Sequence, residues 1–181
     1  MSRWLFASIL LIIAAAFLYT YLAKKELGFD PIQELPNEVL MMENEGDLES
    51  LDLKSSNPTD LDSFFSKQKD LHFTPFLLKV PSQWEIQGVS IIDYDFVKIA
   101  MTRFHKTDQK DLLFHFTLSG HIEDLSASSK RSIDHFLYQA YSSDQLNLIA
   151  WQHDPHTISI LVGHLSAEDL AHIAANSGSA F

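Results

Sequence analysis

The sequence predicts an α+β fold: one N-terminal transmembrane helix, followed by a small antiparallel sheet with helices packed on one face. Three observations lead to this fold class. An uncharged apolar run stands near the start of the chain, alternating apolar and polar residues recur in its middle, and capping motifs precede two amphipathic segments. The predicted parts are a cytoplasmic stub at residues 1–3, a transmembrane helix at 4–23, an acidic tether at 24–58 and a periplasmic domain at 59–181.

The apolar run at residues 4–23 contains no charged side chain, and its length suits the roughly 20 residues that a helix needs to cross a membrane. Aromatic residues such as Trp4 and Tyr21 stand near its ends, as interfacial anchors do. A cleaved signal peptide is the alternative. However, its apolar core is usually shorter, at about 7–15 residues, and Tyr21 occupies a position where cleavage needs a small residue. We therefore expect an uncleaved anchor.

The positive charges around the run nearly balance, with Arg3 before it and Lys24 and Lys25 after it. The short cationic start followed by a long acidic domain favours an N-terminus in the cytoplasm. We therefore expect a single-pass protein of the bacterial inner membrane, with its C-terminal domain in the periplasm.

Small residues in the run, Ala15, Ala16 and Thr20, would permit close approach of a partner helix in lipid. We expect them to bind a partner, although alanine is also simply common in membrane spans. The expected partners are an integral membrane protein complex or a membrane regulator, together with the lipid bilayer.

Composition excludes several functions. The net charge is -11 and no basic cluster appears, so nucleic-acid binding is not expected. The chain has no cysteine, which excludes disulfides and thiolate metal sites. It has no hydrolase elbow, zinc-protease motif or phosphate-binding glycine loop. We therefore predict that the chain is not an enzyme, with no catalytic residue and no cofactor.

The acidic segment at residues 24–58 is interrupted by Pro31 and Pro36, and such a composition is typical of a flexible tether. A short apolar patch at residues 39–42 could dock on a partner or on the domain itself, or be only a hydrophobic interruption of the linker. After the tether, Thr59 is expected to cap a helix that ends near Asp70.

Period-two alternation then predicts strands, with a polar turn in each of two hairpins. The segment at residues 133–141 is ambiguous, and we expect irregular structure with one helical turn there. Ser166 is expected to cap a final helix that stops at Asn176. Trp151 is expected in the core, and His115 is expected to face solvent or a partner. The predicted strands cover residues 89–92, 96–104, 111–118, 146–151 and 157–162.

Nine histidines invite a metal interpretation. His153 and His156 stand on a predicted turn, and His164 follows the next strand, so their imidazoles could share a zinc or copper ion. A metal site usually needs three or four converging ligands, and this spacing is a weak pattern. Solvated turn histidines are the favoured interpretation.

The block at residues 148–174 has a strand that closes in tryptophan, a short turn, a second strand and a capped helix. Through this block, residues 60–177 resemble the extracytoplasmic domain of bacterial single-pass transmembrane anti-sigma factors. The residues that carry the resemblance are Trp151, Val162, Gly163, Leu165, Leu170, Ile173 and Ala174.

The family's cytoplasmic sigma-binding domain has no counterpart in the expected stub at residues 1–3. The resemblance therefore implies a membrane-anchored outer domain that binds something else. We expect a non-catalytic accessory or assembly subunit of a larger membrane complex. The alternative is an anti-sigma-like sensory or regulatory module that acts through a partner protein.

Overall fold

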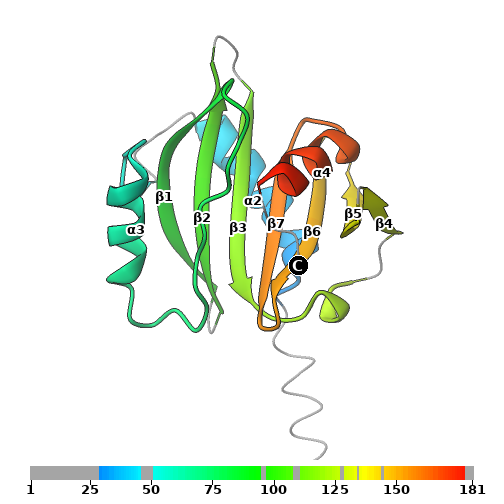
Figure 1. The fold of residues 1–181 in the computed structure, drawn as a ribbon, viewed down its shortest axis with the longest axis horizontal. Helices are drawn as coiled ribbons and strands as arrows, with labels where there is room; N and C mark the ends of the chain where they lie inside the picture. Colours follow the sequence, from blue (N-terminus) through cyan, green and yellow to red (C-terminus); the bar gives the residue numbers. More distant parts are fainter. Residues whose placement is uncertain are drawn as a thin grey trace, which may run out of the picture.

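The chain forms one seven-stranded antiparallel sheet in the order β1-β2-β3-β7-β6-β5-β4 (Figure 1). The strands are β1 (Trp84–Tyr94), β2 (Val97–Lys106), β3 (Leu112–Ser119), β4 (Ser129–Ile133), β5 (Phe136–Ser142), β6 (Asn147–Asp154) and β7 (Thr157–Gly163). The helices are α2 (Pro31–Glu45), α3 (Pro58–Ser66), α4 (Ala167–Asn176) and the 3-10 helix η2 (Ile122–Asp124). The structure, a computed structural model, describes residues 29–45, 51–94, 97–107, 111–126, 129–133, 135–143 and 145–177.

Two meanders build the sheet. Strands β1, β2 and β3 form one, and β4, β5, β6 and β7 form the other. From the end of β3 the chain crosses to the far edge through η2, and it then winds back until β7 pairs with β3. The two halves of the domain therefore meet along one central pair of strands, which Figure 1 shows between β2 and β6.

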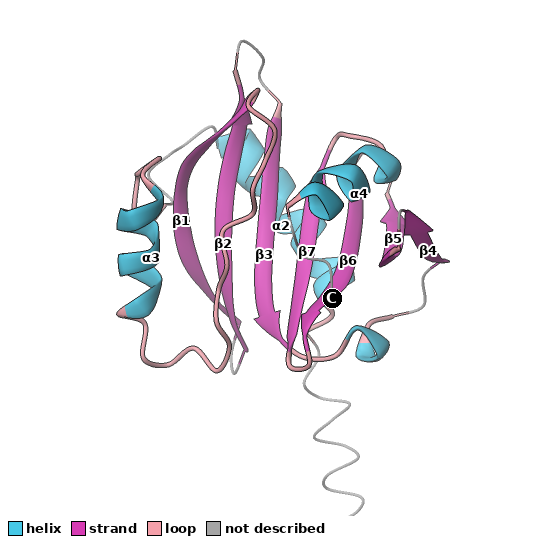
Figure 2. Cartoon of the chain, viewed as in Figure 1, coloured by secondary structure: helices cyan, strands magenta, loops and turns pink. Residues whose placement is uncertain are grey.

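Helices cover both faces of the sheet, with α2 behind it and α4 in front of it in Figure 2. Successive residues of β3 pack on opposite faces of the sheet: Phe114 packs in the same cluster as Leu35 of α2, whereas Leu113 packs with Leu170 of α4. Helix α3 covers the end of the sheet at β1, where its Leu61 packs against Val89.

The fold class that we predicted is wrong in two respects. The sheet has seven strands rather than four or five, and its helices lie on both faces rather than on one. The physical reason lies in the central strands, which are buried on both sides although one side carries polar residues such as His115 and Ser159. Every residue of β7 is buried, so a helix on only one face would leave half of this strand uncovered.

The segment at residues 133–141 is also not irregular. It completes β4 and forms β5, which pair as a hairpin from Ile133↔Phe136 to Ser129↔Ala140. The turn contains His135 with a φ of 70°. Glycine or asparagine usually marks such a left-handed position, and their absence removed the sequence signal for a turn.

Part of the predicted tether belongs to the domain. Residues Pro31–Glu45 form α2, in which Leu35 and Val39 are fully buried. The hydroxyl of Tyr94 donates a hydrogen bond to the carboxylate of Glu38 (3.1 Å), and burial followed by the negative charge of Glu38 raises the pKa of Tyr94. Acidic residues that suggested a flexible linker, such as Glu38, therefore lie on a docked helix.

No helix in the described part of the chain is long and apolar enough to cross a membrane. The predicted transmembrane helix at residues 4–23 lies outside the described residues, together with Ala15, Ala16 and Thr20. For the described residues, the fold class is therefore corrected to a seven-stranded antiparallel sheet with three α-helices. The localisation as a single-pass inner-membrane protein with a periplasmic domain is withdrawn with it.

The predicted N-terminal cap is confirmed for one helix and wrong for the other. At α4, the Ser166 hydroxyl accepts a hydrogen bond from the backbone N–H of Asp169 (3.1 Å), so the predicted cap is confirmed. At α3, the cap is Asn57 rather than Thr59. The Asn57 side chain accepts from the Thr59 N–H (3.1 Å), and Pro58 takes the first helical position, which needs no N–H donor.

Candidate binding site

Strands β5 and β6 pair over only part of their length. Their ladder runs from Ser142↔Asn147 to Gln139↔Ala150 and stops there, although β5 extends back to Phe136 and β6 runs on to Asp154. The first half of β5 and the second half of β6 therefore diverge. We call the space between residues 136–138 and residues 151–154 the split.

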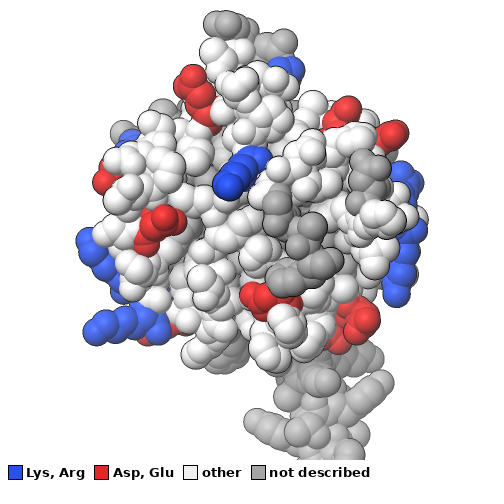
Figure 3. All heavy atoms as spheres, in the orientation of Figure 1, with Lys and Arg blue, Asp and Glu red and all other residues white. Residues whose placement is uncertain are grey.

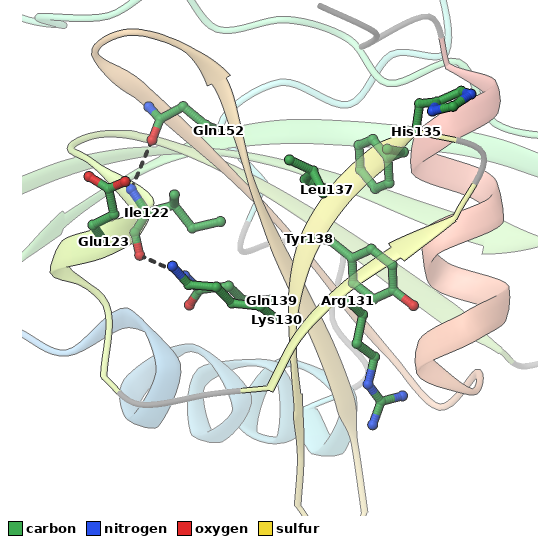
Figure 4. A pocket seen from close by; sticks show the side chains of 10 residues that line it. Ile122, Glu123, Lys130, Arg131, His135, Leu137, Tyr138, Gln139 and Gln152 are labelled. Atoms are coloured by element: carbon green, nitrogen blue, oxygen red, sulfur yellow. Dashed lines mark hydrogen bonds between the residues drawn. The ribbon is translucent and has the colours of Figure 1, made fainter.

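A cavity of about 330 Å³ lies at the split (Figure 4). Its walls come from η2, β4, the turn after β4, β5 and β6. The residues that line it are Ile122, Glu123, Lys130, Arg131, His135, Phe136, Leu137, Tyr138, Gln139 and Gln152.

Two glutamines hold the wall formed by η2, through the hydrogen bonds drawn as dashed lines in Figure 4. The Ile122 N–H donates to the Gln152 side-chain oxygen (2.8 Å), and the Gln139 side-chain amide donates to the Ile122 carbonyl (3.1 Å). The Tyr141 hydroxyl in turn donates to the Gln139 side-chain oxygen (2.7 Å). These bonds fix the wall in place, so the cavity is formed before any ligand binds.

Leu137 gives the cavity an apolar contact point. Its residue surface is 73% exposed, which is unusual for a leucine in the middle of a strand. Figure 4 shows it with Ile122 and Gln152 on one side and Tyr138 and Arg131 on the other. Helix α4 packs on the opposite face of β5, against Phe136 and Tyr138, and leaves Leu137 exposed. An exposed apolar side chain beside a cavity is a typical contact for a ligand.

The charges around the cavity differ from those of the whole chain. The described residues that line the cavity include two cations, Lys130 and Arg131 of β4, and one carboxylate, Glu123, whereas the whole chain carries a net charge of -11. Among the described residues neither of these two cations takes part in an ion pair. Figure 3 shows basic side chains along the edge of the molecule where Figure 1 places β4. The site therefore favours an anionic partner.

A second polar cluster lies buried under the segment that follows α3. His115 of β3 is 1% exposed, and among the described residues neither of its ring nitrogens has a hydrogen-bond partner. The Trp151 indole N–H and the Ser159 hydroxyl also lack one. The ring of Phe76 lies over the cluster, with its centre 4.8 Å from that of His115 and 3.8 Å from that of His153.

Burial, and then the neighbouring His153, lower the pKa of His115 to about 3, so its imidazole is neutral at pH 7. The prediction that His115 faces solvent or a partner is wrong. Its side of β3 is covered by α4 and by the Phe76 segment, so alternation away from one apolar face leads here to a second buried face.

The three candidate metal ligands are not brought together. His153 stacks on Phe76, His156 lies in the turn between β6 and β7, and His164 lies beyond the opposite end of β7. The His164 ring bonds the Glu43 carboxylate (3.0 Å) instead. Within the described ranges there is no group of three or more side chains that could hold a metal ion.

The residues of the split were not among the site residues predicted from the sequence. Leu137 lay in the segment that we expected to be irregular, and Gln152 was counted only as part of a turn. The sequence marks Gln152 only by its position, as a polar residue directly after a predicted buried strand.

No protein-family model, no curated protein and no solved structure matches the chain. The resemblance to anti-sigma factor outer domains therefore stays a prediction.

Proposed function

We propose that this chain is a non-catalytic binding module that attaches to another protein at the split and serves as an accessory or assembly subunit of a larger complex. The observation that carries the proposal is the interrupted β5–β6 ladder, which leaves a formed cavity beside the exposed Leu137.

The chemistry of the cavity supports binding rather than turnover. Two of its polar side chains, Gln139 and Gln152, are engaged in holding η2. Catalysis by general acids and bases needs titratable groups within reach of one reacting atom, usually with shifted pKa values. His115, whose pKa is lowered to about 3 by burial, lies under Phe76 and does not line the cavity.

The proposal is tested by affinity purification of the full-length chain, with stoichiometry read by mass spectrometry. Leu137→Ser removes the apolar contact at the split, and Met41→Ser is the matched control because Met41 is also exposed (58%) but lies on α2. We expect Leu137→Ser to reduce recovery of the partner roughly tenfold, as loss of a central apolar contact does. Met41→Ser should have no effect.

A partner recovered equally with both variants would contradict the proposal. The stoichiometry separates the two expected functions. Subunits recovered at a fixed ratio indicate an accessory subunit, whereas a regulator at substoichiometric amounts favours the anti-sigma-like regulatory alternative.

A further inference from the structure

We infer that the split binds an extended, acidic segment of the partner protein, with an apolar side chain on Leu137 and carboxylates beside Lys130 and Arg131. This inference rests on the proposed function and names the chemistry of the partner. It follows from the backbone, the charges and the size of the site.

The backbone of β5 favours an extended ligand. In an antiparallel strand every second residue directs its N–H and C=O groups to the same neighbouring strand. Over residues 136–138 of β5, the groups directed towards β6 meet no rung of the ladder, because pairing stops at Gln139↔Ala150. An extended segment can take up these groups by adding to the strand, as many recognition domains allow.

The charges favour an acidic segment. In the β4–β5 register, Lys130 is opposite Gln139 and Arg131 is opposite Tyr138, so both cations lie one strand away from the split. Successive strand residues project to opposite faces, and Figure 4 shows the two side chains on opposite sides of the ribbon. A ligand in the split therefore has a cation near each face, and arginine can hold a carboxylate through two hydrogen bonds.

The size of the site suits a short segment. A cavity of about 330 Å³ is at the small end of the range for ligand pockets, roughly 300–1,000 Å³. It can hold a few side chains of an extended strand but not a folded surface. Among the described residues that line it, one carboxylate, Glu123, stands against Lys130 and Arg131, so this lining carries a net positive charge.

The test uses the full-length chain and three fluorescein-labelled heptapeptides, read by fluorescence anisotropy. All share a Val-Leu-Val centre, which is flanked on each side by two glutamates, two serines or two lysines. We expect the acidic peptide to bind roughly tenfold more tightly than the basic one, with the serine peptide between them. The difference should narrow as salt is raised, because the charges are exposed.

Charge reversal at the site supplies the decisive variant. Lys130→Glu combined with Arg131→Glu should invert the order of the acidic and basic peptides. Lys79→Glu is the matched control, because Lys79 is exposed and does not line the cavity. Leu137→Ser should weaken all three peptides by the same factor. Circular dichroism and thermal unfolding verify that each variant is folded.

The inference is overturned if no peptide binds, if the three bind equally, or if the double reversal leaves their order unchanged. A labelled oligothymidylate that binds as tightly as the acidic peptide would also overturn it, since the cations would then attract anions of any kind. If partner recovery depends on Leu137 but not on the two cations, the proposed function stands and this inference fails. If recovery depends on neither, both fail.

Discussion

The centre of the sheet and its β4–β5 end are covered differently. At the centre, residues 113–119 of β3 pair without interruption with residues 157–163 of β7, and helices lie on both faces. At the end, β5 keeps only part of its ladder with β6, and β4 is exposed over most of its length.

Whether a leucine is buried in this sheet depends on whether another segment packs over it, and not on its hydrophobicity alone. Leu161 of β7 is fully buried between α4 and the sheet, whereas Leu137 of β5 is 73% exposed. The two outer edges differ in the same way. Leu53 closes the β1 edge through two backbone hydrogen bonds with Val89 (2.9 and 3.1 Å), and a side chain at Gly88 would collide with this segment. The β4 edge carries Lys130 and Arg131 instead, charges that discourage pairing with another sheet.

The sharpest test of this difference compares two truncations. Trp151 is 1% exposed in the core beside the split, so Trp151→Ala should lower the free energy of unfolding by about 3–5 kcal/mol. Leu137→Ala should change it by less than about 0.5 kcal/mol, because an exposed side chain loses little on truncation. Urea denaturation of both variants measures the contrast. Equal losses would mean that Leu137 is packed and the split is closed.

The next test asks whether α2 belongs to the centre. Leu35 is fully buried against the sheet, so Leu35→Ala should cost about 2–5 kcal/mol. Met41 on the same helix is 58% exposed, and Met41→Ala is the control, with an expected change near zero. The same denaturation measurement applies. A Leu35 variant as stable as the control would mean that α2 does not pack on the sheet.

The third test concerns pH. Folding lowers the pKa of His115 from 6.5 to about 3 because the ring is buried, so between these values the unfolded chain binds more protons. The contribution of neutral His115 to the free energy of unfolding is therefore fully present above about pH 6.5. As the pH drops towards 3, this contribution is lost by up to about 1.4 kcal/mol per pH unit. His115→Leu should remove this slope. Its stability at pH 7 should change little, since neither ring nitrogen has a partner among the described residues.

The control for this titration is His172→Gln, which changes an exposed histidine on α4. Burial also lowers the pKa of His153, and this contribution has the same sign and remains in every variant. The measurement is the free energy of unfolding at several pH values between 7 and 4. A slope for His115→Leu equal to that of the unchanged chain would show that the ring is accessible to protons in the folded state.

The parts of the fold that sequence analysis predicted are those with a local signal. The cap at Ser166 and the hairpins of β2 with β3 and β6 with β7 are each specified by neighbouring residues, and the structure confirms them. The burial of Trp151 is confirmed as well. Each of these features is determined by residues that are close together in the sequence.

The parts that failed depend on distant contacts. The residues Leu35, Val39 and Met42 have helical spacing, but their acidic neighbours pointed to a linker, and only the sheet surface makes the segment fold. The split has even less signal in the sequence, because it is the point where two strands stop pairing. No single residue type marks such a point, so neither the cavity nor the exposure of Leu137 could be predicted from the sequence.

The junction of the two meanders has a consequence for folding. Within each meander, partner strands are close in sequence, and their hairpins close short loops. The rungs between β3 and β7 join residues that are far apart, such as Leu113 and Gly163, and closing so long a loop costs more chain entropy. Contacts of this kind raise the contact order and slow folding. The most buried strands of the sheet are thus the ones whose pairing closes the longest loop, while the β5–β6 contact stays local and can open without separating the two halves.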